Sequence, residues 1–502
     1  MLPFSIITVR TNPSLWGSRG LARTRVDWRS VVRVICPLGA LLIEGWPALI
    51  GAVLVQEGGL LLARRATDSC HRRLTTNLFL LAYALRVAIV LPTHYVAKLG
   101  DGNGALFRDD YTNDLVAEWL VRIAHGEGAT AIFPGHQYLL DSVYTYLLMA
   151  IYAIFGYTPI LPKLLNVGLA ALGVVLTFEI SRKLFSLRAA MLAALGTALL
   201  PSLIVWSVAT LKETPVLLTC LVALWLLQLL SETRRGDPQL ISTLIGLFGV
   251  SLLLLDLRDA SAFIVVALIA MVGIGRLRLR LHAWQMGLAG AAVVVFMVGG
   301  LLVMRARTNN RPLSASFEDV ALQIRHRRAQ EATGASSQLR STDASGSATT
   351  PDRPAAEVDS DTAPFSFVGD VIDPLGYALL APTPWQAQSS LELAASAEML
   401  VWDVLLVASV LAWWAAPRNR LFFACLIAYG VANWLVLAAV EGNVGNLLRH
   451  RMMLDPVLLV LGTAGLDWLW VTGRGSAAAR PAALRHRTRT QAISGLKQEQ
   501  AN

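Results

Sequence analysis

The sequence predicts an all-helical membrane protein that crosses the bilayer about ten times. Of its 502 residues, 55% are hydrophobic and only 15% are charged, and the mean hydropathy is +0.54. A soluble protein has about 25% charged residues. The apolar residues come in blocks of about 20, the length of helix that spans a hydrocarbon core roughly 30 Å thick. A soluble enzyme, a fibrous chain and a disulfide scaffold are therefore excluded.

The charged residues indicate the topology of the chain. The net charge is +9, and in a membrane protein such an excess marks cytoplasmic loops more often than nucleic-acid binding. We therefore expect no nucleic-acid partner. Lysine occurs only five times while arginine and alanine are abundant, which suggests a G+C-rich bacterial genome. The four cysteines are scattered and show no metal-binding or redox spacing.

Ten apolar blocks are long enough to be transmembrane helices. They lie at about 76–98, 163–184, 189–207, 214–231, 239–256, 260–275, 283–304, 396–416, 420–440 and 452–472. If the first of these runs outward, every short basic cluster falls on the cytoplasmic side, as the positive-inside rule requires. These clusters are Arg64, Arg65, Arg72 and Arg73; Arg182, Lys183 and Arg188; Arg234 and Arg235; Arg276, Arg278 and Arg280; Arg418 and Arg420; and the tail beyond Arg474.

Two further apolar segments must not add a single crossing, because that would move the later basic loops to the other side of the membrane. Residues 138–156 are rich in tyrosine, and we interpret them as a re-entrant or interfacial helix within one long outer loop, 99–162. Arginines flank both ends of 31–63, which favours a helical hairpin kinked near Pro47 over a single span.

Five regions follow from this topology. Residues 1–75 form a basic cytoplasmic N-terminus with the membrane hairpin, and 76–304 form the transmembrane core. Residues 305–395 form a large periplasmic loop, in which a Ser/Thr/Ala/Pro/Asp-rich stretch at 330–363 is expected to be disordered. The C-terminal helices occupy 396–472, and a basic cytoplasmic tail occupies 473–502.

The remaining ionisable residues collect on the outer face. They are Asp109, Asp110, Asp114 and His136 in the first outer loop, Lys163 opening the second span, Lys212 and Glu213 between spans three and four, Asp256, Arg258 and Asp259 between five and six, and Glu441, Arg449, His450, Arg451 and Asp455 between nine and ten. Carboxylates and cations together at the lipid–water boundary suit a substrate with an anionic phosphate and an apolar tail. Arg and Lys would bind the phosphate, and a carboxylate could deprotonate an acceptor hydroxyl.

Structural roles compete with these functional ones. A cation at the end of a span commonly extends to the lipid headgroups. Asp109 or Asp110 could cap an amphipathic helix that runs to about His125. Lys212 and Glu213 could be an exposed ion pair of small energetic value.

Taken in order, these features resemble the GT-C superfamily of integral membrane glycosyltransferases, most closely the bacterial relatives of protein O-mannosyltransferases and of the lipid A aminoarabinose transferase. Members have an acidic motif in the first outer loop, an interfacial helix, a basic residue opening the second span and a polar hairpin between spans three and four. FRDDYTNDLVAEWL is similar to the first element around Asp109, Asp110 and Ala117. Residues 161–185 and 199–219 are similar to the later elements.

The resemblance covers about 76–275 and, more loosely, 396–472. It implies a GT-C-like bundle in the bacterial inner membrane and inverting transfer of a sugar from a polyprenyl-phosphate donor to a lipid, glycan or protein acceptor at the periplasmic face. It also implies that Asp110 or Asp109 is the general base. The residues implied for the donor phosphate are Lys163, Lys212, Arg258, Arg449 and Arg451, with Asp114, His136 and Glu213 in support.

The chain departs from the family pattern at two points, which leaves open which aspartate acts. Asp114 stands near the place of the tyrosine expected after the acidic pair, and FPGHQ lacks a doubled proline. No organic cofactor is implied, and a divalent metal is left open. Two alternatives remain: an O-antigen-polymerase-like enzyme that uses Arg325, Arg327 and Arg328, and a non-enzymatic transporter or scaffold of polysaccharide export.

Overall fold

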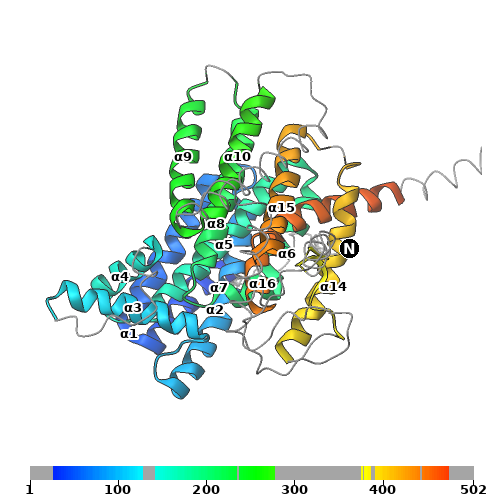
Figure 1. Cartoon of the computed structure of the whole chain (residues 1–502). Coiled ribbons are helices and arrows are strands. Elements are labelled where there is room, and N and C mark those ends of the chain that lie inside the picture. Colours follow the sequence, from blue (N-terminus) through cyan, green and yellow to red (C-terminus); the bar gives the residue numbers. More distant parts are fainter. Residues whose placement is uncertain are drawn as a thin grey trace, which may run out of the picture.

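The computed structural model describes residues 27–127, 142–234, 237–276, 375–376, 378–385, 390–415, 417–440 and 444–473. Over these ranges the regular structure is entirely helical (Figure 1). Among the described helices, nine are long and apolar enough to cross a membrane, or up to ten if one bent pair counts as a span. The described part of the chain is thus a polytopic α-helical membrane protein, as predicted.

Eight of the ten predicted spans occur as single helices. They are α2 (Arg72–Asp101), α5 (Ile160–Leu184), α8 (Glu213–Glu232), α9 (Gln239–Leu257), α10 (Asp259–Arg276), α14 (Ser390–Leu411), α15 (Arg420–Val440) and a final helix, Asp455–Gly473. The centre of the bundle is α5, of which 83% of the apolar stretch is buried against its neighbours. The predicted span 283–304, the stretch 330–363, the arginines at 325–328, His136, Glu441 and the basic tail lie outside the described residues.

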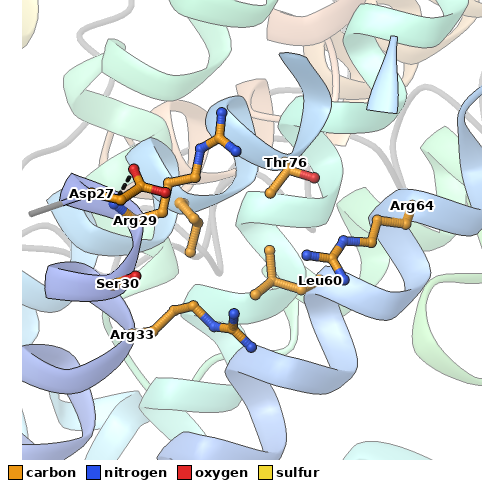
Figure 2. Close-up of a pocket in the computed structure, with 8 residues that line it drawn as sticks. Asp27, Arg29, Ser30, Arg33, Leu60, Arg64 and Thr76 are labelled. Atoms are coloured by element: carbon orange, nitrogen blue, oxygen red, sulfur yellow. Dashed lines mark hydrogen bonds between the residues drawn. The ribbon is translucent and has the colours of Figure 1, made fainter. Parts of the chain in front are cut away.

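The first helix, α1 (Trp28–Ala66), folds back on itself. Its backbone leaves the helical region at Glu44 and Gly45, and Gly45 has a φ of 74°, which favours glycine. The Arg33 guanidinium pairs with Glu57, so the two arms lie side by side (Figure 2). This is the arrangement expected of the hairpin at 31–63, with its break slightly before Pro47.

One apolar helix is too short to cross a membrane. This is α4 (Val143–Phe155), whose 13 residues extend only about 20 Å, too short for the hydrocarbon core. The Val143 N–H donates to Asp256 Oδ2 (2.8 Å) at the end of α9, and the other end of α4 leads directly into α5. Both ends of α4 therefore lie at one face of the bundle, while the interfacial position expected within 138–156 stays a prediction.

The predicted span 189–207 is broken, contrary to the expectation of one continuous helix. It consists of α6 (Leu187–Leu199) and α7 (Pro201–Ser207), which meet at an angle of 51°. Pro201 has no N–H to continue the hydrogen bonding of α6, and its ring clashes with the preceding turn. Arg86 of α2 supplies donors in place of the missing ones, at 3.2 Å from the carbonyl oxygens of Thr197 and Ala198.

The two faces of the bundle differ in chemistry. On one, Arg182 at the end of α5 pairs with Asp68 (2.8 Å), and Arg418 donates to the Arg182 carbonyl (3.0 Å). Because these contacts join the loops predicted to be cytoplasmic, we call this the basic face. The opposite face carries α3 (Arg108–Ala124), α4, the end of α7 and α16 (Val444–Arg451), and we call it the site face.

Candidate functional site

The three aspartates of α3 differ sharply in exposure. The Asp109 side chain is 61% exposed, whereas Asp110 and Asp114 are 0% and 1% exposed. Residues four apart lie on the same side of a helix, so Asp110 and Asp114 both face the bundle while Asp109 points away from it. Helical periodicity thus separates the two neighbouring aspartates that the sequence could not distinguish.

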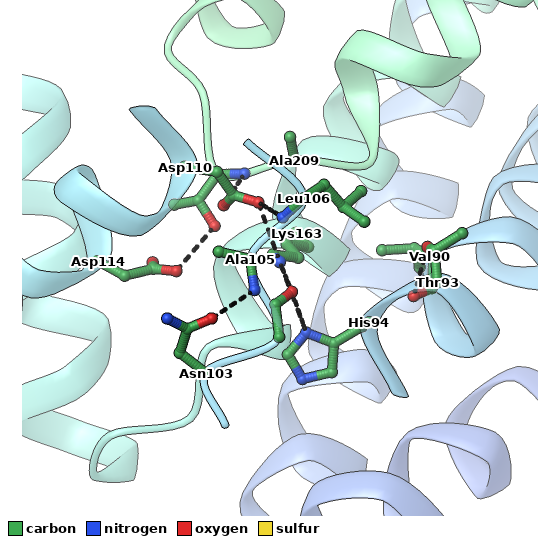
Figure 3. A network of polar contacts seen from close by, with 12 residues as sticks. Val90, Thr93, His94, Asn103, Ala105, Leu106, Asp110, Asp114, Lys163 and Ala209 are labelled. Carbon is green, nitrogen blue, oxygen red and sulfur yellow. Dashed lines mark hydrogen bonds and ion pairs between the residues drawn. The ribbon is translucent and has the colours of Figure 1, made fainter. Parts of the chain in front are cut away.

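Asp110 joins three segments of the chain (Figure 3). Its Oδ2 accepts from the Leu106 N–H (2.8 Å) and lies 3.1 Å from Lys163 Nζ on α5. Its Oδ1 accepts from the Thr210 N–H (2.8 Å) in the loop after α7. Neither aspartate is the N-cap residue of α3, which is Phe107 and has no side-chain cap. Asp110 still satisfies one backbone N–H just before the start of α3, that of Leu106, so a structural role holds for Asp110 and not for Asp109.

Lys163 extends this network to the hairpin. Its ammonium group donates to the Gly104 carbonyl (2.5 Å) and lies 3.5 Å from His94 Nδ1. His94 Nε2 in turn lies 2.9 Å from Glu44 at the tip of α1. Gly104 has a φ of 74°, and a Cβ there would lie 2.2 Å from the imidazole, so this turn requires glycine. A continuous buried polar path therefore connects the tip of the hairpin to α3.

Asp114 connects α4 to the same polar network, that of Asp110, Lys163 and Thr210, which we call the Asp110–Lys163 frame. Tyr152 donates its hydroxyl to Asp114 Oδ1 (2.5 Å), and Thr210 Oγ1 lies 3.4 Å from Oδ2. Burial, and then the nearby Asp110, raise the pKa of the Asp114 carboxyl well above its usual range. Asn113 donates to the Thr210 carbonyl (2.9 Å). Because Asp110 accepts from the N–H of the same residue, α3 holds the loop after α7 through both backbone groups of Thr210.

The sequence did not single out Glu44, His94 or Tyr152. Glu44 and His94 are isolated polar residues 50 positions apart in apolar segments, and Tyr152 is one of several tyrosines in α4. Their partners become evident only when the helices pack together. The one signal available was the cost of an ionisable residue in an apolar helix, which applies to Glu44 and His94.

A second cluster lies at the exposed edge of this frame. Arg449 of α16 donates through Nη1 to Asp109 Oδ2 and through Nη2 to Glu213 Oε1, both at 2.6 Å. Glu213 is only 2% exposed, and its Oε2 has no hydrogen-bond partner among the described residues. Arg449 thus bridges an exposed carboxylate and a buried one.

Other basic residues lie near Glu213. His450 Nε2 lies 4.0 Å from Glu213 Oε1. Burial, and then the positive charge of Arg258, lower the pKa of His450 well below its usual value, and Lys212 acts in the same direction. Residues from α3, the α7–α8 loop, the α9–α10 turn and α16 therefore meet at one place, as expected from the sequence.

Two of the predicted phosphate ligands, Lys163 and Arg451, lie in the protein interior and not in the cluster around Glu213. Lys163 is fully buried and already engaged by Asp110 and the Gly104 carbonyl. Arg451 is 3% exposed, donates Nε and Nη2 to the Ala378 carbonyl (3.1 and 2.7 Å), and lies over the Trp402 ring. Both cations therefore act within the protein interior, where they join segments distant in the sequence.

No family model matches the chain, and no curated protein matches it. Among the residues that the structure describes, no group of three or more His, Cys, Asp or Glu side chains could hold a metal ion.

Proposed function

We propose that this protein is a membrane glycosyltransferase with a GT-C-like architecture. It would transfer a sugar from a polyprenyl-phosphate donor to an acceptor hydroxyl at the site face, which the charge pattern predicts to be periplasmic. The observation that supports this best is the Asp109–Arg449–Glu213 bridge. In this bridge an accessible carboxylate lies beside a cluster of basic residues, and a phosphate lipid would present its headgroup at this face.

Asp109 is the favoured general base. Both oxygens of Asp110 already accept hydrogen bonds from backbone N–H groups, and one of them also pairs with Lys163. The Asp109 carboxylate makes one ion pair and is otherwise open to a substrate. A base must come within hydrogen-bond reach of the proton that it removes, which an exposed side chain can do and an enclosed one cannot.

The proposed step is a single displacement. The acceptor oxygen forms a bond to the anomeric carbon while the bond from that carbon to the donor phosphate oxygen breaks. The acceptor proton passes to Asp109, and the phosphate leaves with the bonding electron pair. Lys212, Arg258 and Arg449 would stabilise the charge that develops on the departing phosphate. The Asp110–Lys163 frame would hold α3 in position.

The test is genetic complementation with chemical analysis of the products. A strain lacking the gene would receive the wild type, Asp109→Asn, Asp110→Asn or, as a control, Glu118→Gln, which removes a partly exposed carboxylate of α3 paired with Arg122. Lipid-linked and surface glycans would be profiled by mass spectrometry at matched protein levels. We expect Glu118→Gln to restore the missing glycan and Asp109→Asn to reduce transfer by about 10²–10⁴-fold.

Full restoration by Asp109→Asn would overturn the assignment of the base. Restoration by both aspartate variants would overturn the transferase proposal itself. With purified protein in detergent, a new glycosidic product formed from polyprenyl-phosphate sugar would support transfer, because no compartment exists across which an intact lipid could be moved.

One observation favours transport as a second candidate function. The broken span α6–α7 and the buried Arg86 beside it are features that transporters use at substrate sites. In a transporter the lipid-linked sugar would change sides with its glycosidic bond intact. The detergent assay distinguishes the two functions, because only a transferase would yield product there.

A further inference from the structure

A cavity of about 150 Å³ lies between the two arms of the α1 hairpin and the start of α2, far from the site described above (Figure 2). It is lined by Asp27, Arg29, Ser30, Arg33, Leu60, Arg64, Thr76 and Leu80. Arg64 lies in the last turn of α1, at the end of its second arm, and Thr76 lies in the first turns of α2. The cavity is therefore at the basic face of the bundle. None of these residues has a role in the proposed transfer.

The lining of this cavity favours an anion. Arg29, Arg33 and Arg64 contribute three guanidinium groups: Figure 2 shows those of Arg33 and Arg64 beside Leu60 and that of Arg29 toward Thr76. Glu57 neutralises Arg33 by direct pairing. The only carboxylate in the lining is Asp27, which accepts from the backbone N–H of Arg29 (3.3 Å). The cavity and Glu57 together thus hold three positive charges against two negative ones.

One of these arginines, the partly exposed Arg29, has a single donor atom that is shielded from solvent. Arg29 Nε is shielded from solvent and has no hydrogen-bond partner among the described residues. A buried donor without a partner costs about 1–3 kcal/mol, so such groups are ordinarily satisfied by a ligand, an ion or water. A phosphate oxygen is a strong acceptor for guanidinium donors.

The surroundings of the cavity are those of a lipid site. Next to the lining residues in sequence, Val34, Ile35, Leu61 and Leu62 are each 50–60% exposed, which gives the hairpin an apolar outer surface. Acyl chains can lie along this surface while the headgroup enters the cavity. A free phosphate ion would gain nothing from these neighbours. Basic pockets between transmembrane helices on the cytoplasmic side bind anionic headgroups.

The geometry points to a binding site for the phosphate of an anionic phospholipid headgroup, held by Arg29 and Arg64. Arg33 is fixed by Glu57 and serves to keep the arms together. Such a lipid would stabilise the hairpin against α2. This inference is independent of the transfer reaction, since the two sites lie on opposite faces of the bundle.

The test uses the purified full-length protein in dodecylmaltoside micelles. The melting temperature would be followed while dioleoylphosphatidylglycerol, dioleoylphosphatidylcholine or inorganic phosphate is added. The variants are Arg64→Gln and Arg29→Gln/Arg64→Gln. The matched control is Arg65→Gln, which removes an exposed arginine of the same helix turn that does not line the cavity.

We expect phosphatidylglycerol to raise the melting temperature of the wild type and of Arg65→Gln alike. In the double variant, the apparent Kd should weaken by about tenfold or more. Equal stabilisation by phosphatidylcholine or by inorganic phosphate would overturn the lipid assignment. An equal loss in Arg64→Gln and Arg65→Gln would show that only the general charge of the face matters, which would also overturn it. If the double variant does not fold, the comparison of the two single variants decides.

Discussion

Lys163 and Asp110 form an ion pair that is completely enclosed: Nζ lies 3.1 Å from Oδ2, and neither side chain is exposed. The pair links the start of α5 to the first turn of α3, and Thr210 closes it from a third segment. Its position explains how a surface helix such as α3 is held at a fixed place over the membrane bundle. The exposed Asp109 is therefore presented by a rigid support.

We expect Lys163→Met to destabilise the protein by about 3–5 kcal/mol, because it leaves the Asp110 carboxylate buried without its counter-ion. The double variant Asp110→Asn/Lys163→Met should recover part of this loss, since no charge remains unpaired. Thermal unfolding in detergent measures both effects. An unchanged melting temperature in Lys163→Met would mean that the pair does not hold α3 in place.

Arg449→Lys tests the bridge between Asp109 and Glu213. Lysine retains the charge but lacks the planar fork that reaches both carboxylates. We expect the variant to fold, since Glu213 keeps a cation nearby, and to lose transfer activity by about 10–100-fold. Product formation by the purified variant, normalised to folded protein, measures this loss. Activity equal to the wild type would exclude the bridge from the reaction.

The raised pKa of Asp114 makes stability dependent on pH. At a pH between the unfolded and the folded pKa, the folded chain holds a proton on Asp114 that the unfolded chain has released. The free energy of unfolding that comes from this carboxyl is therefore fully present below the unfolded pKa and is lost as the pH rises through the folded pKa. Asp114→Asn mimics the protonated carboxyl and can still accept from Tyr152. We expect the melting temperature to fall less in this variant than in the wild type as the pH rises above the ordinary aspartate pKa of about 3.9. Equal slopes would contradict the assignment.

Arg86→Met should destabilise the protein by at least about 2 kcal/mol, because the Thr197 and Ala198 carbonyls at the end of α6 lose their donors. Arg188→Met, which removes an arginine at the basic face that lies over Trp470, is the control and should cost much less. Thermal unfolding compares the two variants. Similar melting temperatures would mean that the bend at Pro201 needs no cap.

The two faces can be assigned by labelling. In a version without its four cysteines, single cysteines at Glu127, after α3, and at Arg65, at the end of α1, should react with an impermeant reagent from opposite sides. Both positions are exposed. We expect Glu127→Cys to react from the periplasmic side of intact cells. Labelling of both from the same side would overturn the predicted topology and, with it, the location of the site.

The position of most helices was readable from the sequence alone. A transmembrane helix is specified locally, because about 20 apolar residues match the thickness of the hydrocarbon core and backbone hydrogen bonds are satisfied within the segment. The hairpin at 31–63 and the surface helix at 138–156 followed from the same argument, combined with the charge of the loops. The break at Pro201 was a local signal as well, but the prediction of a continuous span overlooked it.

The partners of the charged residues were decided only by the tertiary structure. Asp109 and Asp110 are neighbours in the sequence, yet one meets Arg449, 340 positions away, and the other meets Lys163 and Thr210. The sequence by itself determined where the chain enters the membrane, since that depends on the transfer of each segment into lipid. Which polar groups are enclosed, and which stay available to a substrate, depends on how helices distant in the sequence pack against one another.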